Sequence, residues 1–282
     1  MFNFFANVFG YALNFIYGLV NNYGLALIIF TVVLKLFMLP ISIYQQKTMK
    51  KSAKIQKKSK IIQDKYKGDQ ARMNQELMDL YKRENMSPFS GCLSSIVQIV
   101  LVLSMFYLVS RPLTYMKHVD SELIKSYSQE IQEERNQRYT EIAIIRTKSA
   151  EDDRVYINMD FLGLNLSSVP SQNYNDWKVF IIPVLYVITS FVSTRVTANL
   201  NKANKEEKED KKETKELKKK DDDDFDMAEE MNRNMAIMMP LMTVSIALIA
   251  PLGLALYWLV NNLLMLGERF ALNKFLKSDE EG

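Results

Sequence analysis

The stretch Tyr23–Tyr44 reads YGLALIIFTVVLKLFMLPISIY, and its twenty-two residues carry a single charged side chain, that of Lys35. At a rise of 1.5 Å per residue, about 20 apolar residues span the ~30 Å hydrocarbon core of a bilayer. The stretch is therefore predicted to be a transmembrane helix.

Three further segments are as apolar as the first. Pro88–Ser110 and Val179–Thr194 contain no charged residue, and Met235–Gly267 is uncharged over thirty-three residues. Because the last segment is too long for one span, Pro251-Leu252-Gly253 at its middle predicts a tight turn between two short helices. We expect an all-α membrane protein with five transmembrane helices, at 23–44, 88–110, 177–197, 235–250 and 252–270.

Residues 1–22 show a different pattern, in which apolar side chains recur with a helical period of 3.6. Asn and Gly residues occupy another face of the same predicted helix. We interpret 1–22 as an amphipathic helix that lies in the membrane interface. Its expected apolar face comprises Phe2, Phe5, Phe9, Leu13, Ile16 and Val20, and its expected polar face Asn3, Asn7, Gly10, Asn14 and Asn21.

The whole-chain averages, 48% hydrophobic and 24% charged residues, conceal this segregation of apolar and charged segments. The chain has one cysteine and one histidine, Cys92 and His118. An internal disulfide is therefore excluded, and so is a zinc site built from several His and Cys ligands. We expect no catalytic site, no metal and no cofactor.

The distribution of Lys and Arg predicts the orientation in the membrane. Segment 45–87 has twelve basic and five acidic residues, which places it in the cytoplasm by the positive-inside rule. Segment 111–176 is then an extracellular cap, and the charged loop 198–234 and the tail 271–282 are cytoplasmic. The N-terminus is expected outside.

The cytoplasmic segment 45–87 is predicted to be a basic helical hairpin that turns at Lys67-Gly68-Asp69. Such a hairpin can attract anionic lipid or ribosomal RNA, or it can serve only to fix the topology, and the sequence does not separate these readings. In the cap, Val119, Leu123, Tyr127 and Ile131 favour a helix, and Arg154-Val155-Tyr156-Ile157 favours a short strand.

Three motifs resemble those of the YidC membrane protein insertase family, part of the Oxa superfamily. Tyr23–Ile41, with Lys35 where the family usually has Arg, resembles its first core span. Ser87–Leu93 with Gln98 resembles the "NPLxGCLPxxxQ" entry to the second span, although Ser94 replaces the customary proline. Pro251–Trp258 with Asn261 and Asn262 resembles the "PxGLxLYWxxxN" final span. The pattern is similar to the short, five-span members of the Gram-positive type, and this resemblance implies a location in a bacterial plasma membrane.

The resemblance implies a hydrophilic groove that is open to the cytoplasm and to lipid but closed on the outside. It implies that the groove admits a hydrophilic segment of a nascent membrane protein, whose apolar segment then moves into the bilayer. The implied partners are small one- or two-span clients, membrane lipids and also the Sec translocon, the ribosome and the signal recognition particle pathway; DNA is not among them.

Lys35 is the most informative candidate residue. A charge within the bilayer costs about 2.5–3.5 kcal/mol on insertion scales, so it normally faces the bundle interior or a wet cavity. The alternative is that its long side chain reaches toward the interface. We expect no Asp or Glu in the spans to neutralise it. The predicted groove residues are Lys35, Thr31, Gln98, Gln46 and Asn262, although each polar residue alone is more often a contact between helices.

Methionines predict a path for the apolar part of a client. Met227, Met231, Met235, Met238 and Met242 recur on one helical face, and flexible Met side chains suit varied apolar sequences. Ordinary packing explains the same pattern equally well. The predicted slide residues are Met238 and Met242, with Met105 and Phe106 as counterparts in the second span.

Two other classes of function compete with an insertase. An intramembrane enzyme is disfavoured because the spans lack the His and paired carboxylates that catalysis needs. A small-solute or ion transporter often contains inverted repeats and broken helices, which this chain does not show. The transporter is kept as the alternative to an insertase.

Overall fold

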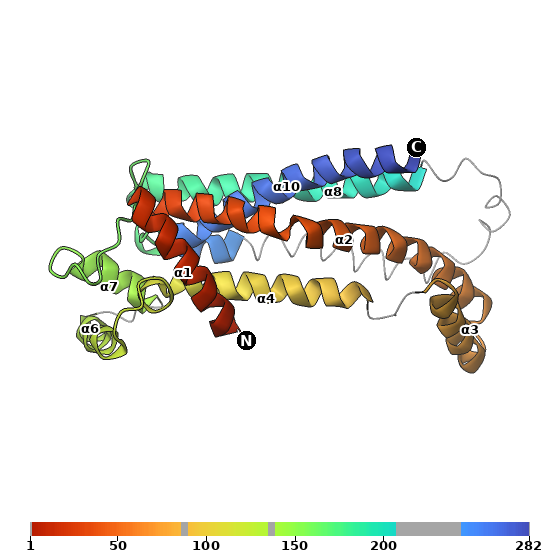
Figure 1. The fold of residues 1–282 in the computed structure, drawn as a ribbon, viewed down its shortest axis with the longest axis horizontal. Helices are drawn as coiled ribbons and strands as arrows, with labels where there is room; N and C mark the ends of the chain where they lie inside the picture. Colours follow the sequence, from red (N-terminus) through yellow and green to blue (C-terminus); the bar gives the residue numbers. More distant parts are fainter. Residues whose placement is uncertain (1, 86–89, 135–138, 207–243, 282) are drawn as a thin grey trace.

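The computed structural model describes residues 2–85, 90–134, 139–206 and 244–281 (Figure 1). These residues are mostly helical, and among them the strands form one two-stranded antiparallel sheet. The long helices are α1 (Phe2–Val20), α2 (Tyr23–Lys65), α4 (Ser90–Ser110), α8 (Ile181–Glu206) and α10 (Leu252–Glu281).

Helix α2 continues without a break through Pro40 from the first apolar segment into the basic segment. Its 43 residues make it about 65 Å long. The Asn22 side chain accepts a hydrogen bond from the Leu25 backbone N–H and so caps the start of the helix. The span expected at 23–44 and the first arm of the hairpin expected at 45–87 therefore form one continuous helix.

At its far end α2 packs against α3 (Gln70–Arg83), which folds back beside it (Figure 1). The turn falls at residues 66–69, and the Asp69 carboxylate accepts a hydrogen bond from the Arg72 backbone N–H at the start of α3. Ile55 of α2 and Leu80 of α3 are buried in the hairpin, whereas most of its basic side chains face outward.

Helices α8 and α10 lie side by side along much of their length, with α2 next to α10 (Figure 1). The Tyr186 and Trp258 rings join α8 to α10 with their centroids 5.8 Å apart. Residues 244–249 are helical, the helix ends at Ala250 and Pro251, and α10 begins at Leu252.

Among the described residues, two helical segments, Tyr23–Thr48 and Trp177–Val196, are long and apolar enough to cross a membrane, and Ile99–Ser110 is a shorter apolar helix. This result and the helical fold agree with the expected all-α membrane protein. The count of five spans stays a prediction, and most of the span expected at 235–250 lies outside the described residues.

Helix α1 crosses α4 and α2, and the Phe9 ring lies 5.9 Å from the Phe30 ring. The predicted polar face is wrong at Gly10, which is fully enclosed. A Cβ atom there would overlap the Tyr115 carbonyl oxygen and lie 2.6 Å from the carbonyl carbon. The buried stripe is Ala6, Gly10, Leu13 and Tyr17, because small residues allow α1 to approach the backbone after α4, while Phe4, Val8, Tyr11, Phe15 and Leu19 are exposed.

The cap is a small cluster at one end of the bundle (Figure 1). A helix expected around Leu123 and Tyr127 is confirmed, but the strand expected at 154–157 is wrong. Arg154 instead lies in a turn, where its backbone N–H and guanidinium donate to the Asp152 carboxylate, and this local bonding replaces strand pairing. The cap elements are α5 (Pro112–Tyr115), α6 (Ser121–Glu134), α7 (Thr140–Lys148), β1 (Asp160–Phe161), β2 (Leu164–Asn165) and the short 3₁₀ helix η1 (Pro170–Gln172). A second 3₁₀ helix, η2 (Trp177–Phe180), leads from the cap into α8.

Residues 158–168 of the cap, which we call the strap, bind the ends of three long helices. The Tyr23 N–H at the start of α2 donates to the Asn158 carbonyl at 3.0 Å, and the Asn158 N–H donates to the Tyr17 hydroxyl of α1 at 2.8 Å. The Leu252 and Gly253 N–H groups at the start of α10 donate to the Ser168 and Leu166 carbonyls, both at 2.9 Å. The strap therefore holds α1, α2 and α10 together at the cap end.

Candidate functional site

The central feature is an ion pair between α2 and α10. The Lys35 Nζ atom lies 3.1 Å from Oε2 of Glu268, 233 positions away in the sequence. The expectation that no acidic residue neutralises Lys35 is therefore wrong. Glu268 lies directly after the uncharged stretch that ends at Gly267, yet still inside the range predicted for the fifth span.

Both charged side chains are largely enclosed, with 24% of Lys35 and 12% of Glu268 exposed. The second carboxylate oxygen of Glu268, Oε1, is buried and has no hydrogen-bond partner among the described residues. The pair is thus a single contact rather than a bidentate one, and it leaves part of the carboxylate unsatisfied.

Thr31 lies one turn before Lys35 and is buried. Its hydroxyl donates to the Leu27 carbonyl of the same helix at 2.6 Å. Thr31 and Lys35 thus lie one turn apart on α2, and the Thr31 hydroxyl forms its hydrogen bond within the helix.

Asn262 of α10 is also buried, and its Nδ2 donates to the Thr189 hydroxyl of α8 at 3.4 Å. The Thr189 hydroxyl in turn donates to the Tyr186 carbonyl at 3.0 Å. This chain of bonds joins the two helices. Asn262 therefore acts as a contact between helices, which was the alternative to its lining a groove.

The other predicted groove residues are more distant along their helices. Gln46 lies on α2 about three turns beyond Lys35 and is half-buried. Gln98 lies on α4, and its side chain is outside the described part of the structure. Lys35 and Glu268 are thus the pair that the fold brings into contact, and the rest of the groove stays a prediction.

Of the predicted slide residues, Met105 is fully buried in the core and Phe106 is half-buried. The Phe106 ring meets the Tyr107 ring edge-on, with centroids 6.2 Å apart. Met238 and Met242 lie outside the described residues, so their role stays a prediction.

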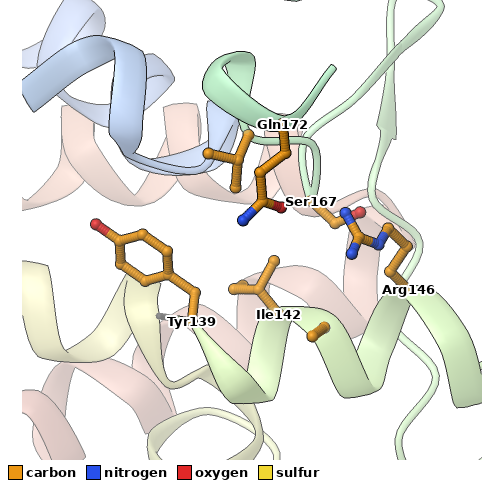
Figure 2. A pocket seen from close by; sticks show the side chains of 7 residues that line it. Tyr139, Ile142, Arg146, Ser167 and Gln172 are labelled. Carbon is orange, nitrogen blue, oxygen red and sulfur yellow. The ribbon is translucent and has the colours of Figure 1, made fainter. Parts of the chain in front are cut away.

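A small pocket opens in the cap, and Lys35 is not among the residues that line it (Figure 2). Figure 2 shows the Tyr139, Ile142 and Arg146 side chains of the α7 segment facing Ser167 and Gln172 across it. Sequence reasoning did not indicate this pocket, because its polar residues come from separate parts of the cap. No group of three or more His, Cys, Asp or Glu side chains that could hold a metal occurs in the described residues.

Two acidic groups in the cap have shifted pKa values. Burial raises the pKa of Glu141, while its carboxylate accepts hydrogen bonds from the Thr114 N–H at 3.0 Å and the Thr114 hydroxyl at 2.6 Å. The Arg154 guanidinium lowers the pKa of Asp152 to about 2. Both groups are bonded within the cap, and neither contacts Lys35 or Glu268.

Comparison with known proteins supplies the family. The model of the 60Kd inner membrane protein family, which includes YidC and Oxa1, matches residues 15–280. The chain belongs to this family. The family is one of bacterial inner membrane proteins, and the relatives described next are named as membrane protein insertases rather than as enzymes.

Among curated relatives, the membrane protein insertase YidC of Rickettsia felis is 28% identical over 266 residues. Those of Rickettsia akari and Rickettsia prowazekii are 29% and 27% identical over the same length. Each match covers 94% of this chain and 38% of the relative. The chain therefore spans well under half the length of these YidC proteins.

Proposed function

We propose that this chain is a membrane protein insertase and chaperone that receives nascent membrane proteins in a cytoplasm-open groove and releases their apolar segments into the bilayer. Its membership of the YidC family supports the proposal. The observation that carries it is Lys35, a cation within the apolar segment Tyr23–Thr48 that is long enough to cross a membrane, where it faces α10 rather than the outside of the bundle.

The proposed topology has five spans, with the N-terminus outside and the C-terminus in the cytoplasm, and with the helix 1–22 in the interface. The cap would then close the outer end, while the hairpin of α2 and α3 lies in the cytoplasm. Cys92 is the single cysteine, so a Cys92→Ser background with one new cysteine at a time allows each loop to be labelled from one side of the membrane.

In the proposed mechanism, Lys35 attracts the acidic residues of a client's hydrophilic segment. The groove shortens the hydrocarbon distance that this segment must cross, and Gln46, Gln98 and Asn262 offer uncharged hydrogen-bonding groups along its walls. The methionines at 238 and 242, with Phe106, guide the apolar segment toward lipid, whereas Met105 packs in the core. The basic hairpin attracts lipid headgroups or ribosomal RNA, and the Sec translocon and the signal recognition particle pathway are proposed partners.

Complementation in cells depleted of their own insertase tests the proposal. The wild-type chain should restore insertion of a single-span client whose translocated tail carries three Asp residues, and photoreactive residues at 46, 98 and 238 should crosslink to the stalled client. Lys35→Ala should lower insertion of this client severalfold, because its acidic tail loses a charge-assisted contact, whereas Lys35→Arg should retain most of the insertion.

A matched control is Lys58→Ala, which removes a cation from the exposed hairpin pair with Glu84. Its effect on the same client should be small. Failure of the wild-type chain to insert any client, together with proton- or sodium-linked solute uptake by the purified protein in vesicles, would favour the transporter instead.

A further inference from the structure

The depth of the Lys35–Glu268 pair follows from the helices that carry it. Lys35 lies twelve residues after the start of α2 and Glu268 sixteen residues after the start of α10, and the strap holds both starts together. At 1.5 Å per residue, the two residues lie about 18 and 24 Å from the strap. In a hydrocarbon layer of about 30 Å, both lie beyond the midplane, toward the hairpin end.

A charge at this depth needs a partner. With Glu268 in contact, the Lys35 ammonium is neutralised before any client arrives, and the net charge of the pair is zero. Arg269, the next residue of the same helix, adds a further cation, so the three side chains together keep a net positive charge.

The pair is built so that it can be exchanged. One contact at 3.1 Å holds the two side chains, and the second oxygen of Glu268 is buried without a partner in the described residues. A carboxylate optimised for stability would be hydrogen-bonded through both oxygens, because the unsatisfied oxygen carries its full desolvation cost. Another carboxylate can therefore replace that of Glu268 on Lys35 at little net cost, while the Glu268 carboxylate turns into the water of the proposed groove.

We propose that Glu268 determines client specificity by acting as an internal counter-ion that an acidic client displaces. This inference rests on the proposed insertase function. An acidic client exchanges its carboxylate for that of Glu268, whereas an uncharged client leaves the pair intact and meets no unpaired cation. Glu268 thus reduces the difference between acidic and uncharged clients and broadens the range that the groove accepts.

Two clients that differ only in the translocated tail, three Asp against three Asn, provide the test in cells depleted of their own insertase. In Glu268→Gln the ratio of acidic to uncharged client inserted should rise about tenfold over the wild-type ratio, because the uncharged client now leaves Lys35 unpaired. Glu76→Gln, which removes a carboxylate that pairs with Arg83 at 3.7 Å in the hairpin, should leave the ratio unchanged. An unchanged ratio in a folded, inserting Glu268→Gln protein would overturn the proposal.

A second measurement uses the wild-type protein, so it tests the displacement of Glu268 even if Glu268→Gln does not fold. Carbodiimide labelling of Glu268 in the wild-type protein, read by mass spectrometry, should be low without a client and with the Asn client, and should rise severalfold with the Asp client. Continued protection of Glu268 with the Asp client bound overturns the exchange. If the wild-type chain inserts neither client, the insertase function itself fails and this inference fails with it.

Discussion

The contact of α1 with the residues after α4 yields a sharp prediction about stability. Replacing Gly10 by Ala places a Cβ atom that overlaps the Tyr115 carbonyl oxygen and lies 2.6 Å from the carbonyl carbon and 3.2 Å from the Met116 nitrogen. Nonbonded carbons are separated by about 3.5–4.0 Å at their optimum. The two backbones must therefore move apart by about 1 Å, and neither is the flexible end of a side chain.

The magnitude follows from a comparison within the same helix. A Cβ atom added at Gly18 of α1 would have no neighbour within 4 Å, so Gly18→Ala adds a side chain without a clash. Both substitutions gain about 1 kcal/mol of helix propensity, which cancels between them. The difference that remains is the cost of overpacking, about 1–3 kcal/mol, with Gly10→Ala the less stable protein.

Thermal unfolding of the purified protein in detergent measures this difference. For a chain near this size, about 1 kcal/mol corresponds to 2–4 °C, so Gly10→Ala should unfold several degrees below Gly18→Ala. Gly18→Ala should unfold at or slightly above the temperature of the wild-type protein. Equal unfolding temperatures for the two variants would show that α1 does not pack closely against the backbone at Tyr115.

Two further predictions concern the cap. Glu141→Ala removes the acceptor for both Thr114 donors and should destabilise the protein by about 1–3 kcal/mol in thermal unfolding, whereas Glu122→Ala on an exposed surface should change it by less than about 0.5 kcal/mol. The pKa of Asp152 is lowered from 3.8 to about 2 in the folded cap, so its contribution to stability is present above pH ~4 and is lost as the pH falls toward 2. The protection factor for hydrogen exchange in the 152–157 turn, which corrects for the intrinsic pH dependence of exchange, should therefore fall over this range more in the wild-type protein than in Asp152→Asn. Equal acid dependence of the two protection factors would contradict the assignment.

Local patterns in the sequence predicted much of the helical structure. The apolar run around Lys35 and the break at Pro251 correspond to α2 and to the start of α10, because length, hydropathy and proline act through nearby residues. The strand predicted at Arg154 is absent because the Arg154 backbone N–H donates a hydrogen bond to the Asp152 side chain, two residues away. Such a bond depends on local geometry that hydropathy does not encode.

The sequence predicted one residue of the central ion pair but not its partner. Lys35 could be identified from a single charge in an apolar run, but its partner Glu268 is 233 positions away, and no local pattern joins them. Gly10 was assigned to a polar face because a glycine offers no side chain from which to infer burial. Its true environment comes from the approach of Tyr115, which depends on the packing of α1 against distant helices.

The strap has a mechanical consequence for the bundle. Because α2 and α10 are hydrogen-bonded to it at their first residues, the two helices can separate only by pivoting about that end. A relative tilt of about 10° displaces the backbone of Lys35 by about 3 Å and the far end of α2 by about 11 Å, given the helical rise. The first displacement equals the length of the Lys35–Glu268 contact, so a small rotation opens the ion pair while the hinge at the strap keeps its bonds. Because α3 packs at the far end of α2, a partner that binds the hairpin and displaces it also changes the distance between Lys35 and Glu268.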